Sequence, residues 1–257
     1  MAHNSVRLPV LQSGLGATLR RDSWWLGPAL TVAILGSFIV YATFRAFENA
    51  NYMDGPYLSP MYSPLIDTSW AKGWPIPVSG AMLILAGPAS FRFTCYYYRK
   101  AYYRAFAMDP PACAVGERNA KSYSGEKGIW IFQNLHRFTL YVALMFLVFL
   151  WHDAFKGLTG WSDGVHLNVG TLVITLNATL LSLYTLSCHA LRHLVGGNVN
   201  SYSTATLGGL RHSLWKFVSM LNTKHMQFAW VSLFGVALTD FYVRSVAAHW
   251  ITDVRFF

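Results

Sequence analysis

The sequence predicts an all-α integral membrane protein, a single domain of residues 1–257 arranged as a bundle of five transmembrane helices. Two observations lead to this fold class. Hydrophobic residues make up 54% of the chain and charged residues only 12%, which is about half the charged share of a soluble domain. The apolar residues also form continuous runs rather than an alternating pattern, which favours helices over a β-barrel. Such a composition excludes a disordered chain and a secreted disulfide scaffold.

A helix needs about 20 mostly apolar residues to cross the hydrocarbon layer. Five runs of this kind predict spans at about 24–47, 75–99, 128–153, 165–193 and 225–251. The first run is uncharged over 24–44, the second continues past Arg92, and the third holds a single charge, Arg137, over 129–151. The fourth is uncharged over 165–191, and the fifth is interrupted by Asp240 and Arg244. These last two residues are four positions apart, so we expect them to neutralise each other on one helix face.

Lys and Arg residues are distributed unequally among the predicted loops. The N-terminal segment and the loops after the second and fourth spans carry thirteen of them, whereas the other loops carry three. Because basic loops stay in the cytoplasm, we expect a multi-pass protein of the plasma (inner) membrane with a cytoplasmic N-terminus. The net charge of +9 follows from these loops. No basic face or binding motif accompanies it, so no nucleic-acid partner is expected.

Sulfur and imidazole groups gather near the cytoplasmic ends of the predicted spans. The set comprises Cys95, His136, Cys188, His189, His193 and His225, with Cys113 on a loop at the same face. His189 and His193 share one helix face because they are four residues apart, so both imidazoles can reach one metal. Thiolates with imidazoles favour iron–sulfur or zinc chemistry over magnesium or calcium. Two Cys and two His form the ligand set of a Rieske-type [2Fe–2S] centre, with the cysteines on one iron and the histidines on the other.

Two alternatives to such a centre remain open. A haem b needs two axial ligands on facing helices, and the candidates are His136, His189 and His225. Alternatively, each cysteine is only a small buried hydrophobe and the protein holds no cofactor. A quinone pocket needs flat stacking surfaces and hydrogen-bond donors to the ring carbonyls. The candidates for that pocket are Arg92, His136, Arg137, Gln227 and Trp230.

Several strings, in order, carry a family resemblance: TCYYYRKAYYRAF, DPPACAVGE, SYSGEKG, QNLHRF, SCHALRHLVGG and LNTKHMQFAWVSLFGVALTDFYV. Over roughly residues 20–257 the chain resembles the five-helix membrane anchor, the cytochrome b-type C subunit, of actinobacterial succinate dehydrogenase or fumarate reductase (respiratory complex II). The resemblance implies a subunit that anchors a flavoprotein and an iron–sulfur protein and does not itself oxidise succinate. It also implies electron transfer through the membrane subunit to quinone.

The resemblance further implies a membrane-embedded Rieske-type [2Fe–2S] cluster. A dihaem anchor needs four axial histidines, but the first span has none and the second has Cys95 where a histidine would stand. Four ligands, two of each type, are expected from the implied pool of Cys95, Cys113, Cys188, His189, His193 and His225. The first expectation places His189 and His193 on one iron, with Cys95 and Cys113 on the other. A haem b anchor and a cofactor-free structural anchor are the alternatives.

Overall fold

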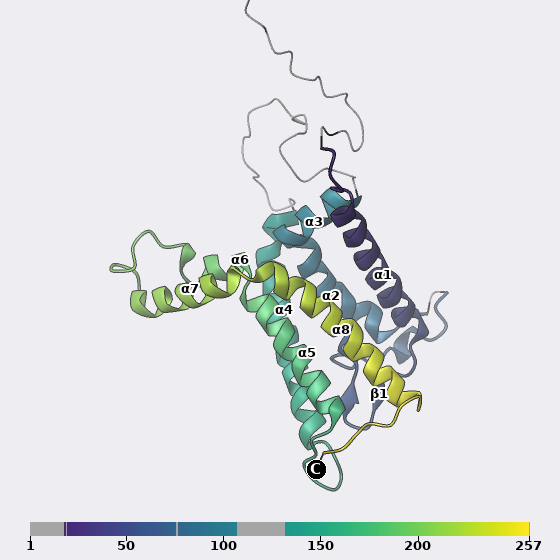
Figure 1. Ribbon diagram of the computed structural model, residues 1–257. Helices are drawn as coiled ribbons and strands as arrows, with labels where there is room; N and C mark the ends of the chain where they lie inside the picture. Colours follow the sequence, from purple (N-terminus) through teal and green to yellow (C-terminus); the bar gives the residue numbers. More distant parts are fainter. Residues whose placement is uncertain (1–17, 19, 76, 107–131, 257) are drawn as a thin grey trace, which may run out of the picture.

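The computed structural model describes residue 18 and the ranges 20–75, 77–106 and 132–256. The bundle helices run side by side (Figure 1): α1 (Leu26–Glu48), α2 (Gly80–Thr94), α4 (Phe132–Thr159), α5 (Val169–Leu186) and α8 (His225–Ala247). One end carries α3 (Tyr96–Phe106), α6 (His189–Arg192), the π-helix η3 (His193–Gly197) and α7 (Gly208–Asn222). We call it the α7 end, because α7 projects there from the side of the bundle (Figure 1).

The opposite end, here called the hairpin end, is closed by short elements between α1 and α2. They are β1 (Met53–Asp54), β2 (Tyr57–Leu58), and the 3-10 helices η1 (Pro60–Tyr62) and η2 (Ser69–Ala71). The two strands pair antiparallel, with Met53 opposite Leu58. Tyr57 is fully buried, and its hydroxyl donates to Asp253 at 2.7 Å. The hairpin is therefore tied to the C-terminal segment that follows α8.

Within the described residues, four helices are long and apolar enough to cross a membrane: α1, α4 from Asn134 onward, α5 and α8. The second predicted span, 75–99, is shorter than expected, because α2 has only 15 residues. Its length of about 22 Å is less than the roughly 30 Å of the hydrocarbon layer. Pro75 and Pro77 disfavour an earlier helix start. The helix instead begins after Ser79, whose side chain accepts from the Met82 N–H at 3.2 Å.

The second and fourth predicted spans are also interrupted at their α7 ends. Each helix stops before a cysteine whose backbone is extended, with φ −61° and ψ 128° at Cys95 and φ −65° and ψ 139° at Cys188. Neither break carries a Gly or Pro, so hydropathy predicted continuous helices to 99 and 193. The hydroxyl residue before each cysteine, Thr94 or Ser187, donates to a carbonyl of its own last turn. Such side-chain bonds compete with helix continuation.

A network of alternating charges lies at the hairpin end and replaces the expected pairing of Asp240 with Arg244. The Asp240 carboxylate instead accepts from the Nε of Arg45 at 2.8 Å, and both side chains are 0% exposed. Arg244 binds Glu48 at 2.7 Å, and Glu48 also binds Arg45. The predicted pair was wrong because α1 supplies a carboxylate and a guanidinium that the spacing within α8 does not reveal. Arg45 on α1 thus contacts a carboxylate of α8, and Arg244 on α8 contacts a carboxylate of α1.

Replacing Asp240 by Asn tests this network. The substitution keeps the size of the side chain but leaves the buried Arg45 without its main counter-charge, which costs about 3–5 kcal/mol. We expect a clearly lower midpoint of thermal unfolding for the purified complex. As a control, Asp67→Asn removes a carboxylate that is exposed and accepts only from Ser69 nearby, so the loss is below about 0.5 kcal/mol. Equal effects of the two substitutions would contradict the assignment.

Candidate functional site

A cavity of about 800 Å³ at the α7 end brings together side chains from elements that are distant in the sequence. Both described cysteines and four histidines line it, together with polar residues: Cys95, Cys188, His136, His189, His193, His225, Thr94, Asn134, Arg137, Asn222 and Thr223. The cysteines are 2% and 1% exposed, so their sulfur atoms lie at the inner wall. The cavity therefore combines a buried sulfur-containing floor with a polar rim.

The two cysteines each contact one histidine on another helix. His136 on α4 places its Nε2 atom 3.0 Å from the Sγ atom of Cys188. His225, the first residue of α8, places its Nε2 atom 3.5 Å from the Sγ atom of Cys95. The described part of the chain gathers no group of three or more His, Cys, Asp or Glu side chains as a metal site. The four donors are thus arranged as two Cys–His pairs on one cavity.

The imidazole of His136 is held in one orientation by α2. Phe91 stacks on it, with ring centroids 4.6 Å apart and an interplanar angle of 14°. Thr94 Oγ1 lies 2.9 Å from Nδ1 and donates its own hydrogen to the Ser90 carbonyl at 2.8 Å. The hydroxyl oxygen therefore accepts from Nδ1–H. This tautomer leaves a lone pair on Nε2, facing the sulfur atom of Cys188, as a metal-binding imidazole requires.

The imidazole of His225 is held in the same way by α5. Tyr184 stacks on it at 5.1 Å and 19°. Ser187 Oγ lies 2.7 Å from Nδ1 and donates to the carbonyl of Tyr184 at 2.9 Å. The Nε2 lone pair consequently faces Cys95. Each histidine is therefore held by a hydroxyl and an aromatic ring of α2 or α5. Each also contacts the cysteine that follows the other of these two helices.

A repeated five-residue pattern underlies this arrangement and was not identified in the sequence analysis. An aromatic residue, two intervening residues, a hydroxyl residue and a cysteine occur as FRFTC over 91–95 and as YTLSC over 184–188. In each copy the aromatic ring and the hydroxyl hold a histidine of a later helix. Comparison of the two copies provides a signal for pairing Cys95 with Cys188, although neither copy contains the histidine that it holds.

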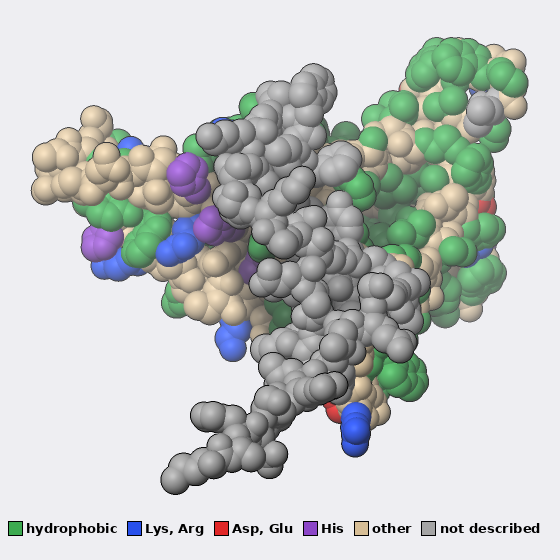
Figure 2. Space-filling view, turned by 90° about the horizontal axis from the view of Figure 1, so that it is seen from above, with side chains coloured by type: hydrophobic (Ala, Val, Ile, Leu, Met, Phe, Trp, Pro, Cys, Tyr) green, Lys and Arg blue, Asp and Glu red, His purple; other side chains and the backbone are tan. Residues whose placement is uncertain are grey.

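The histidines expected to share one iron have a different environment. His189 and His193 are exposed and lie at the rim of the cavity. They also line a neighbouring cavity of about 420 Å³, together with Arg192, Tyr202 and Trp215. Seen from this end, Lys, Arg and His side chains gather along the arm that contains α6, η3 and α7 (Figure 2). Cys113, the remaining member of the expected ligand pool, lies outside the described residues.

The quinone candidates are divided between the cavity wall and its surroundings. His136 and Arg137 line the 800 Å³ cavity. Trp230 is one layer removed, and its Nε1–H donates to the hydroxyl of the cavity-lining Tyr97 at 2.6 Å. Gln227 is exposed on α8. Arg92 is not among the residues that line this cavity, and its guanidinium donates to neutral groups.

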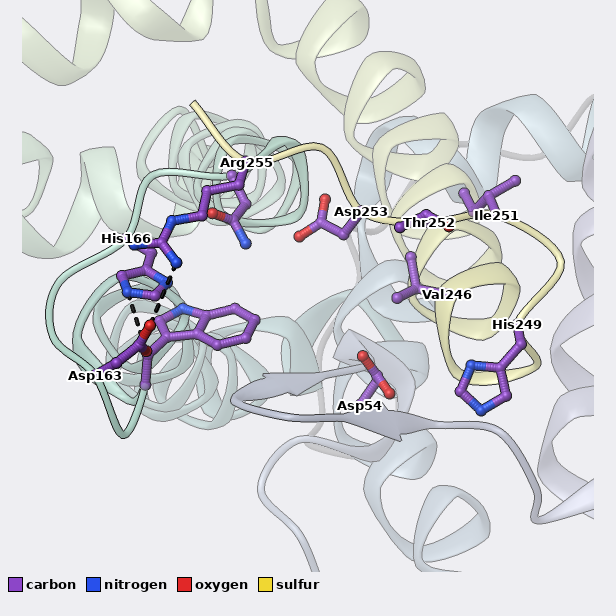
Figure 3. A pocket seen from close by; sticks show the side chains of 11 residues that line it. Asp54, Asp163, His166, Val246, His249, Ile251, Thr252, Asp253 and Arg255 are labelled. Carbon is purple, nitrogen blue, oxygen red and sulfur yellow. Dashed lines mark hydrogen bonds and ion pairs between the residues drawn. The ribbon is translucent and has the colours of Figure 1, made fainter. Parts of the chain in front are cut away.

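A separate cavity of about 470 Å³ lies at the hairpin end (Figure 3). Three of the charged groups that line it, Asp163, Asp253 and Arg255, already have partners in the described structure. Asp163 pairs with His166 at 3.1 Å and with Arg255 at 3.3 Å. Asp253 accepts from the hydroxyl of Tyr242 at 2.6 Å and from a backbone N–H of α5. These contacts tie the C-terminal segment to the bundle, so we place the chemistry at the α7 end.

The model of one protein family, described as actinobacterial succinate dehydrogenase subunit SdhC, matches residues 26–249. The chain belongs to this family. A chain in the solved structure "Mycobacterium smegmatis Sdh1 complex in the apo form" is 40% identical to it, with a TM-score of 0.80. The match covers 93% of this chain and 94% of that chain. Comparison with curated proteins gave no match.

Membership in the SdhC family confirms the prediction of a membrane anchor subunit of succinate dehydrogenase, complex II. It also agrees with the predicted flavoprotein and iron–sulfur partners. The Cys–His pairs therefore belong to a subunit of a respiratory enzyme.

Proposed function

We propose that this subunit carries electrons from the iron–sulfur subunit to quinone through a Rieske-type [2Fe–2S] centre held by Cys95, Cys188, His136 and His225. One observation carries the proposal: two buried thiols and two imidazoles, each with its Nε2 lone pair facing sulfur, share one cavity. These are the donor types and numbers of such a centre. His136 and His225 replace His189 and His193 in the expected ligand set, and Cys188 replaces Cys113.

The same observation favours the cluster over the haem b alternative. A haem with two histidine ligands lies between their imidazoles. Here each Nε2 atom faces a cysteine instead. A cofactor-free anchor does not explain why the same aromatic, hydroxyl and cysteine residues recur at the ends of α2 and α5. The repeated pattern therefore supports a bound group that needs both halves.

The centre, when bound, supplies one-electron transfer, and the chain supplies orientation and protons. Thr94 and Ser187 hold the imidazoles, and burial of the cysteines excludes water from the sulfur ligands. Quinone reduction takes up two protons with two electrons. His189 and His193 are exposed at the cavity rim, so they can pass protons from water to a quinone bound beside Arg137.

We further infer that the subunit lies in the bacterial plasma membrane with its α7 end toward the cytoplasm. The excess of Lys and Arg in the segments at this end supports that orientation. We also infer that α2 and the start of α3 together make the second of five crossings, with the break at Cys95 inside it. Irregular backbone at membrane depth is tolerated where it is buried in protein, and Cys95 is 2% exposed.

Alanine substitutions distinguish the two ligand sets. In the purified complex, His136→Ala and His225→Ala should abolish a Rieske-like EPR signal and electron transfer to quinone. Succinate oxidation with an artificial acceptor should continue, because the flavoprotein is unchanged. The paired controls His189→Ala and His193→Ala should keep the EPR signal and slow quinone reduction. Loss of the signal only in these controls would favour the ligands expected from sequence, and a Soret band in the unmodified complex would favour haem b.

Removing the hydroxyls that orient the imidazoles tests the second layer of the site. We expect Thr94→Val combined with Ser187→Ala to weaken retention of the cluster by about 10–100-fold, the usual effect of losing such partners. The measurement is the decay of the EPR signal during incubation with a chelator. Thr175→Val is a matched control, since its hydroxyl only bonds the Thr171 carbonyl within α5. Identical decay in all variants would show that the hydroxyls do not support the ligands.

A further inference from the structure

Arg92 is a cation in the last turn of α2, three residues before Cys95. Its guanidinium donates to the Tyr98 hydroxyl at 2.7 Å and the Ala229 carbonyl at 3.1 Å. It also donates to the Ser232 hydroxyl at 2.9 Å. All these partners are neutral. The hydrogen-bonding capacity of the side chain is therefore used, but its charge is not neutralised by them.

The other arginines within the bundle show that this situation is unusual. At the hairpin end, Arg45 and Arg244 each contact a carboxylate. Arg137 is exposed and bonds a backbone carbonyl of its own helix. No ion pair joins Arg92 to a carboxylate of the described residues. A half-buried cation in an apolar helix is costly without an opposite charge nearby.

The guanidinium lies close to the Cys95–His225 pair. Its central carbon is 4.6 Å from the centroid of the Tyr184 ring. The same Tyr184 ring stacks on the His225 imidazole, with ring centroids 5.1 Å apart. The imidazole in turn reaches the sulfur atom of Cys95. One aromatic ring thus separates the positive charge from the proposed ligands.

The two five-residue patterns differ at their second position, where only one copy has a cation. Arg92 is the second residue of FRFTC, and the corresponding residue of YTLSC is Thr185. The second copy holds His225 with the same stacking and the same hydroxyl contact although this position is neutral. The five-residue pattern therefore does not itself require a cation at this position, although the Arg92 guanidinium also lies over the Tyr184 ring of the second copy.

We propose that Arg92 is the counter-charge of the reduced centre held by Cys95, Cys188, His136 and His225, and that it raises the reduction potential of that centre. The inference rests on the proposed function. Two thiolates balance the two positive charges of an oxidised [2Fe–2S] core, so one added electron leaves one net negative charge. A guanidinium nearby stabilises that added charge, and low-dielectric surroundings strengthen the effect. The cation therefore favours acceptance of an electron from the iron–sulfur subunit.

An EPR-monitored redox titration of the purified complex tests the role of Arg92. Arg92→Gln removes the charge, whereas Arg92→Lys keeps it, so the midpoint potential should fall in the first variant and stay near that of the unmodified complex in the second. A second pair leaves Arg92 in place. Ser232→Asp puts a carboxylate against the guanidinium and should also lower the midpoint, and Ser232→Asn is its neutral control. If Arg92→Gln fails to assemble, the midpoint potentials of Ser232→Asp and Ser232→Asn test the role of Arg92.

The possible results separate this inference from the proposed centre. An intact Rieske-like signal with the same midpoint in Arg92→Gln and Ser232→Asp would overturn the role of Arg92 and leave the centre standing. A raised KM for quinone with an unchanged midpoint would likewise overturn it and make Arg92 a quinone contact. Absence of the signal from the unmodified complex would refute the centre itself. A lower midpoint in the charge-changing variants alone supports the inference.

Discussion

Inside the bundle, α2 and α5 each end at a buried cysteine with an extended backbone, and the arrangement of the α7 end depends on these two breaks. An interrupted helix leaves carbonyl and N–H groups unpaired, and lipid offers no water to satisfy them. The side-chain amide of Asn222 donates to the Ser187 carbonyl at 2.7 Å, and Thr94 and Ser187 bond their own last turns. Two of the polar residues that bond at the breaks, Thr94 and Ser187, therefore also orient the histidines.

The contacts at the breaks cross from one half of the bundle to the other. The hydroxyl of α2 holds His136, which reaches the cysteine beyond α5, and the hydroxyl of α5 holds His225, which reaches the cysteine beyond α2. Four elements are consequently linked at one level. Buried cysteines pack there with Leu140 and Ala229 in one apolar core. A redox centre needs such rigid support because its ligands must keep their geometry when its charge changes.

The two ends of the bundle differ in how their buried charges are balanced. At the hairpin end, guanidinium and carboxylate groups alternate and cancel, which ties α1 to α8. At the α7 end, the cation of Arg92 has neutral hydrogen-bond partners. A fully neutralised network is suited to holding helices together, whereas an unbalanced cation is suited to a group whose negative charge varies. This difference supports electron transfer at the α7 end.

The sequence alone determined the helical membrane class, four long apolar helices, the family and the end at which sulfur and imidazole gather, because these follow from composition, run length and local motifs. It did not determine which side chains meet. His189 and His193 were favoured because a spacing of four is visible along one helix, whereas the contacting Cys–His pairs are separated by 52 and 130 residues. The pairing of Asp240 with Arg45 was hidden for the same reason. Only the tertiary structure decides such contacts, since they depend on the rotation of each helix about its axis and on where α2 and α5 break.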